Sequence, residues 1–184
     1  MSRKYKFRNP EAAYFVSFSV VEWLDVFSND AYKQILLDSL KFCQREKGME
    51  LYAWIIMTTH VHLVFRSTTK YPPELLLGDF KRFTSKAIVR AIQEAPDNQK
   101  RRKYLAVFQK YGKRTSNVKN FQFWQHDNRP IELWSKWVID QKINYIHQNP
   151  VVAGFVDHPE DYLFSSARDY IGEVGVLEGV VVCK

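Results

Sequence analysis

Two of the five histidines in the chain, His60 and His62, stand two residues apart in the run MTTHVHLVFR (57–66). This run is rich in β-branched and aromatic residues, so we predict a strand, in which alternate side chains share one face of a sheet. The two imidazoles then lie side by side. Because such a pair is costly to bury without partners, it predicts contact with a metal ion or a phosphate.

A second group of polar side chains falls in the segment SKWVIDQKINYIHQNPV (135–151), which predicts a helix. Tyr145 and Asn149 are four residues apart and share a helical face. If that face covers the histidines, then His60, His62 and the Asn149 oxygen could hold one divalent cation, with Tyr145 as a nucleophile toward a phosphate. Each residue also has a structural interpretation: a helical tyrosine usually packs, and an asparagine before proline often ends a helix.

The excess positive charge of the chain lies in one segment. The chain has 184 residues and a formal net charge of +7. Eight of its 27 basic residues and no acidic residue lie in 100–119, which leaves 19 basic against 20 acidic residues elsewhere. Interleaved basic and aromatic residues suit a nucleic-acid surface, and a solvated basic loop is the alternative. The candidate DNA contacts are Lys100, Arg101, Arg102, Lys103, Lys110, Lys113 and Arg114.

The expected elements follow the order β-α-β-β-α-β, with a further helix after them. We predict strands over 12–20, 50–57, 59–66 and 120–125, and helices from Asn29 or Asp30 to about Glu46, from Glu74 to about Ala95, and from about Ile131 or Ser135 to Gln148, before Pro150. The basic segment is expected to be partly irregular. This order predicts an α+β, ferredoxin-like antiparallel sheet with two helices on one face. His60 and His62 would lie on the other face, under the third helix.

The composition favours one globular domain over residues 1–184, with a core over about 10–150 and a tail over 151–184. Hydrophobic residues make up 46% of the chain. Cys43 and Cys183 lie far apart, which predicts reduced thiols rather than a disulfide framework. The polar start, MSRKYKFRNP, does not resemble a signal peptide, and no apolar stretch is long enough to span a bilayer. We therefore expect a cytoplasmic protein.

Several motifs together resemble the HUH-type single-tyrosine transposases, and most closely the REP-associated tyrosine transposase branch of the IS200-like superfamily. They are His60-Val61-His62 after WIIMTT, FKRFTSKAI (80–88), FWQ (123–125), NYIHQNPVVAGFV (144–156) and DYLFSSARDY (161–170). The H-x-H pair is a weak motif by itself, but its combination with Y-I-x-x-N-P-V-x-A-G and S-S-A is specific. One departure is Thr58-Thr59, where members commonly have Pro-Asn.

The resemblance implies a metal-dependent single-stranded DNA endonuclease and strand-transferase with a ferredoxin-like (RRM-like) fold. His60, His62 and Asn149 would hold Mg or Mn. Tyr145 would cleave one strand near an imperfect DNA hairpin, leaving a 5′-phosphotyrosine and a free 3′-hydroxyl. Such a protein could act as a homodimer that shares active sites between subunits, or as a monomer. Two other interpretations stay open: a non-catalytic RRM-like nucleic-acid-binding protein, and a hydrolytic phosphodiesterase that needs no tyrosine.

Overall fold

Four antiparallel strands form the centre of the molecule, in the order β2-β3-β1-β4. The computed structural model describes residues 6–113 and 120–183. Its strands are Ala13–Ser19 (β1), Met49–Ile56 (β2), His60–Ser67 (β3) and Ile131–Leu133 (β4). In this order β3 lies between β1 and β2, which is the arrangement of a ferredoxin-like sheet. The predicted α+β fold is confirmed.

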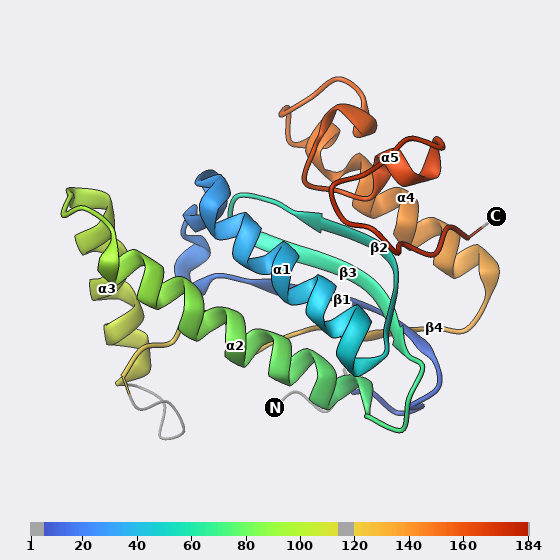
Figure 1. Ribbon diagram of the computed structural model, residues 1–184, viewed down its shortest axis with the longest axis horizontal. Coiled ribbons are helices and arrows are strands. Elements are labelled where there is room, and N and C mark those ends of the chain that lie inside the picture. Colours follow the sequence, from blue (N-terminus) through green and yellow to red (C-terminus); the bar gives the residue numbers. More distant parts are fainter. Residues whose placement is uncertain (1–5, 114–119, 184) are drawn as a thin grey trace.

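Two long helices, α1 (Asp30–Lys47) and α2 (Pro73–Glu94), lie together across one face of the sheet (Figure 1). Helix α1 begins after Asn29, whose side chain accepts a hydrogen bond from the Ala31 amide, as an N-cap does. It ends at Gly48, which has a φ of 69°, a value that favours glycine. The apolar side chains of β3 that alternate with the histidines join the core under these helices: Val61, Leu63 and Phe65.

The fourth strand does not lie at residues 120–125, so that prediction is wrong. Strand β4 lies further along the chain and pairs with the start of β1. Residues 120–125 run irregularly, with a single bridge between Trp124 and Val20. The reason is that Phe123 and Trp124 are consecutive and both buried in the core under α1 and α2. A regular strand would direct two consecutive side chains to opposite faces.

The basic segment is helical up to Gly112, and its residues 114–119 lie outside the described residues. Helix α3 (Gln99–Gly112) begins after Asn98, whose side chain accepts a hydrogen bond of 2.8 Å from the Arg101 amide. Its aromatic residues Tyr104 and Phe108 are buried in the core. Figure 1 shows α3 at the opposite end of the molecule from α4. Tyr104 and Phe108 therefore serve packing.

Helix α4 (Lys136–Val152) covers the other face of the sheet. Its side chains Val138, Ile143 and Ile146 pack in a second core against β1, β2 and β3. The helix continues through Pro150, so the prediction that it stops before this proline is wrong. Pro150 lies in the last turn and is buried, and a proline there removes only one intrahelical hydrogen bond.

The chain after α4 runs along the outer edge of β2. It includes a 3-10 turn (η3, Pro159–Asp161) and a short helix, α5 (Ala167–Tyr170). The amide of Ile56 donates to the Phe164 carbonyl, and that of Ser166 donates to the Trp54 carbonyl. These bonds cover an edge that would otherwise present unpaired backbone groups. Within the described ranges, no helix is long and apolar enough to cross a membrane.

Candidate active site

Strand β3 presents both histidines on the sheet face that α4 covers. The ring centroids of His60 and His62 lie 4.8 Å apart. In the sheet register, His60 is opposite Ser19 of β1 and His62 is opposite Ser17. The His62 ring stacks on Phe15, with centroids 5.4 Å apart and an interplanar angle of 25°. The period of two predicted from the sequence therefore places the pair as expected.

His62 is buried without a polar partner. Only 4% of its surface is exposed, and neither Nδ1 nor Nε2 has a hydrogen-bond partner among the residues that the structure describes. Burial, together with the nearby positive charges of His60 and Lys142, lowers the pKa of His62 to about 3. The imidazole is therefore neutral at physiological pH, which is the form that binds a metal ion. An orphaned buried nitrogen fits such a ligand.

His60 is held from two sides. Its Nδ1 lies 2.9 Å from the Thr59 hydroxyl oxygen. Burial lowers the pKa of His60, and a hydrogen bond with the Asn149 side chain opposes this shift. Asn149 is thus brought to the histidines from α4, as the helical spacing predicted.

The side chains that meet here are two imidazoles and one carboxamide. No group of three or more His, Cys, Asp or Glu side chains within 6–113 and 120–183 could hold a metal. The third protein ligand of a site here would therefore be Asn149 rather than a carboxylate. Imidazole and oxygen donors with open positions suit Mg, Mn, Zn or similar divalent cations.

Tyr145 lies against the histidines and is open to solvent. Its ring centroid is 5.4 Å from that of His62 and 5.9 Å from that of Phe15. The side chain is 48% exposed, whereas the next residue, Ile146, is fully buried. Tyr145 therefore stands at the margin of the packed face of α4, where a substrate phosphate could reach its hydroxyl.

Two residues near this site were missed from the sequence. Lys142 precedes Tyr145 by three residues, and its Nζ lies 5.0 Å from the Phe15 ring centroid and 5.7 Å from that of Tyr145. The i, i+3 spacing in KINY was the signal that could have found it. Trp23, in the 3-10 turn Val21–Trp23 (η1), lies edge-on to His60 with ring centroids 5.7 Å apart. A turn residue such as Trp23 has no periodic signal.

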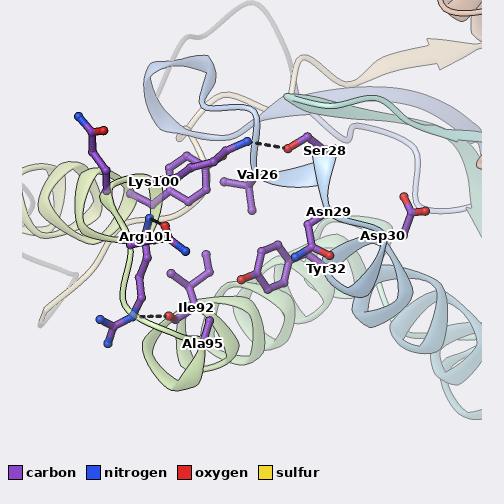
Figure 2. Close-up of a pocket in the computed structure, with 12 residues that line it drawn as sticks. Val26, Ser28, Asn29, Asp30, Tyr32, Ile92, Ala95, Lys100 and Arg101 are labelled. Carbon is purple, nitrogen blue, oxygen red and sulfur yellow. Dashed lines mark hydrogen bonds between the residues drawn. The ribbon is translucent and has the colours of Figure 1, made fainter.

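Several of the predicted basic contacts are paired within the protein. Lys100 Nζ donates to an Asp25 carboxylate oxygen at 2.8 Å and to the Ser28 hydroxyl at 2.9 Å. Figure 2 shows Lys100 and Arg101 beside a cavity at the start of α1, with Arg101 bonded to the Ile92 carbonyl. Two further predicted contacts are also paired: Arg102 with Asp97, and Lys110, whose Nζ lies 3.3 Å from the Glu22 carboxylate. Lys103 and Lys113 make no ion pair with a described residue. Arg114 lies outside the described residues.

The motif DYLFSSARDY anchors the tyrosine helix. The Ser166 hydroxyl accepts a hydrogen bond of 3.0 Å from the Trp54 amide of β2. It also lies 2.9 Å from Nε2 of His147, which is buried on the side of α4 away from Tyr145. This serine therefore connects the β2 edge of the sheet to His147 of α4, which is two residues from Tyr145 in the sequence.

Comparison with known proteins assigns the family. The sequence matches the profile of the family described as "Transposase IS200 like" over residues 18–149. The fold is similar to that of a REP-associated tyrosine transposase bound to a REP hairpin, with a TM-score of 0.66 and 17% identity, over 100% of this chain and 94% of that one. A second solved structure, of a candidate transposase from Deinococcus radiodurans R1, has a TM-score of 0.44 and 18% identity, over 80% of this chain and 95% of that one. No curated protein sequence matches significantly. Since the profile covers most of the chain, the protein belongs to the IS200-like transposase family of DNA transposition enzymes.

Proposed function

We propose that this transposase cuts and joins single-stranded DNA by transesterification at Tyr145. The observation that carries the proposal is the position of Tyr145, with its ring centroid 5.4 Å from that of the buried His62. Both nitrogens of His62 lack partners in the described part of the chain, so the ring is available to bind a metal ion. In an IS200-like transposase, a solvent-accessible phenol beside such a histidine pair fits nucleophilic attack on phosphorus.

The step exchanges one phosphodiester for another. The Tyr145 oxygen forms a bond to the scissile phosphorus as its phenolic proton passes to solvent. The bond between phosphorus and the 3′-oxygen breaks, and that oxygen takes up a proton. The products are a 5′-phosphotyrosine and a free 3′-hydroxyl, and attack by another 3′-hydroxyl reverses the step. The Lys142 ammonium, 5.7 Å from the Tyr145 ring centroid, would offset negative charge on the phosphate.

A divalent cation, Mg or Mn, completes the proposed site. His60, His62 and Asn149 would hold it, and the contact of the Asn149 side chain with His60 and the partnerless nitrogens of His62 among the described residues support this assignment. When bound, the cation neutralises charge that develops on the phosphate. The Thr59 hydroxyl would fix the orientation of the His60 ring toward the ligand position.

The proposed substrate is single-stranded DNA beside an imperfect hairpin. A protein of similar fold is described as bound to a REP hairpin. Of the predicted basic contacts that the structure describes, Lys103 and Lys113 are exposed and make no ion pair with a described residue, whereas the other four are paired. The two cysteines are free, which supports a cytoplasmic enzyme.

We propose that the active site is completed within one chain. Ile143 and Ile146 of α4 pack in one core with Phe15 and Ile55 of the same sheet. The hydrogen bond between His147 and Ser166 adds a polar anchor. These contacts support residues 1–184 acting as a single transposase domain, with the tail after α4 holding the tyrosine helix in place.

The metal assignment is tested by replacing one proposed ligand at a time. We expect His60→Ala and His62→Ala to weaken Mn²⁺ binding by at least about 10-fold and to abolish cleavage of a hairpin oligonucleotide. Tyr145→Phe is the matched control, because it should bind Mn²⁺ as the wild type does and yet not cleave. Mn²⁺ binding is measured by electron paramagnetic resonance. Unchanged binding in both histidine variants would contradict the assignment, and cleavage by Tyr145→Phe would favour a hydrolytic phosphodiesterase.

A further inference from the structure

Trp23 is an exposed aromatic residue in a strained turn. Glu22 and Trp23 have φ values of 52° and 53°, and two consecutive non-glycine residues in this region are costly. The turn is nevertheless fixed by backbone bonds: the Val21 amide donates to the Phe123 carbonyl at 2.9 Å, and the Trp23 amide donates to the Val20 carbonyl at 3.0 Å. The indole is 54% exposed. The turn thus holds a large apolar ring in solvent despite the conformational cost of two positive φ values.

This ring contacts the histidine pair and also lines an open groove. It lies edge-on to His60, with an interplanar angle of 72°. The groove has a volume of about 550 Å³. The rings of Tyr111 and His126 line it as well, together with Gln122 and Gln125, whose side-chain amides donate to the Trp124 and Val20 carbonyls.

The acidic side chain beside the groove is paired with a cation, so it does not repel a nucleic acid. Lys110 lies 3.3 Å from the Glu22 carboxylate, next to Trp23. The same ammonium lies 5.9 Å from the Tyr111 ring centroid. Exposed aromatic rings close to one another are typical of surfaces that bind single strands, where bases stack on the rings.

We propose that Trp23 stacks on a nucleobase of the single-stranded substrate next to the phosphate that Tyr145 attacks. This inference rests on the proposed function, because it places the strand across the histidine face. The groove beyond Trp23 would hold the adjoining nucleotide. Trp23 would thereby fix the position of the strand, and so help to select the bond that is cut.

The test pairs protein variants with single abasic sites in the DNA. All proteins carry Tyr145→Phe, so that no strand is cut and only binding is measured, by fluorescence anisotropy. The oligonucleotides contain a hairpin and its single-stranded flank, with one abasic site at each flank position in turn. Trp23→Ala is compared with Trp23→Phe, which keeps a stacking ring. Phe42→Ala is the matched control, since Phe42 is also exposed (47%) but lies on α1.

We expect Trp23→Ala to weaken binding by about 10- to 100-fold, and Trp23→Phe and Phe42→Ala to weaken it far less. In the protein that retains Trp23, an abasic site at one flank position should weaken DNA binding by a similar factor. In Trp23→Ala, an abasic site at that same position should weaken binding no further. If the losses of DNA binding caused by Trp23→Ala and by the abasic site simply added at every flank position, the stacking role would be overturned, while the proposed function would still stand. Absence of single-strand binding by the protein that retains Trp23 would overturn both.

Discussion

At the scale of single residues, the site depends on groups that hold the histidines as much as on the histidines. Thr59 directly precedes the first histidine, and its hydroxyl lies 2.9 Å from His60 Nδ1. A hydrogen bond to one ring nitrogen fixes the tautomer and directs the other nitrogen to a ligand. Thr59 therefore keeps a polar group in contact with the first histidine.

Thr59→Val removes this hydroxyl while keeping the shape of the side chain. We expect Mn²⁺ affinity to fall by about 10-fold, because the His60 ring loses its orienting partner. Thr58→Val is the matched control, since no hydrogen bond of the Thr58 side chain is present among the described residues, and its carbonyl still accepts from the Phe27 amide. Calorimetric titration measures the affinity. Equal affinities for the two variants would show that Thr59 does not orient the site.

At the scale of elements, the segment 120–128 is hydrogen-bonded to the end of β1 without forming a regular strand. The Gln125 amide donates to the Ser19 carbonyl, and the Ser17 amide donates to the Asn128 carbonyl. Lys81 of α2 holds the segment, because its Nζ donates to the Gln125 carbonyl at 3.0 Å and to the Asn128 side chain. Burial lowers the pKa of Lys81 to about 7, against an opposing effect of Asp127.

This lowered pKa predicts a pH-dependent stability. Between about pH 7 and 10.4 the unfolded chain holds the Lys81 proton while the folded protein releases it, so stability increases as the pH rises. From pH 7 to 9 we expect the free energy of unfolding of the wild type to rise by about 2 kcal/mol relative to Lys81→Met. Urea denaturation at each pH measures this difference. Parallel curves for the two proteins would contradict a lowered pKa.

The elements that could be predicted from the sequence are those with a clear period. The period of two in 59–66 places both histidines on one face, and the four-residue spacing of Tyr145 and Asn149 places them on one side of α4. Residues 120–125 have strand-forming side chains, but Phe123 and Trp124 are both buried in the same core, which prevents a regular strand there. Trp23 could not be predicted, because a left-handed conformation at a residue other than glycine has no sequence signature.

At the scale of the whole molecule, the tail and the sheet together hold the tyrosine helix. The tail covers the outer edge of β2 through backbone bonds, and Ser166 connects that edge to His147 of α4. The apolar face of α4 is packed on the sheet of its own chain. This arrangement favours an enzyme whose histidines and tyrosine act together in one subunit.

Mixing two inactive variants distinguishes this arrangement from a shared site. Tyr145→Phe retains the histidines, and His62→Ala retains the tyrosine. We expect the mixture to form no covalent DNA adduct, because neither chain contains a complete site. The matched positive control is wild type mixed with each variant at the same total concentration. Recovery of adduct to a substantial fraction of the wild-type level would instead indicate that subunits exchange their tyrosine helices.

The most direct test of the central claim is a denaturing gel of wild type and Tyr145→Phe with labelled single-stranded hairpin oligonucleotides and Mg²⁺ or Mn²⁺. The oligonucleotides come from DNA that flanks the gene. We predict a slowly migrating protein–DNA adduct with the wild type alone, together with a released strand that ends in a 3′-hydroxyl. An adduct of equal yield with Tyr145→Phe, or cleavage by both proteins without any adduct, would contradict the assignment of Tyr145 as the nucleophile.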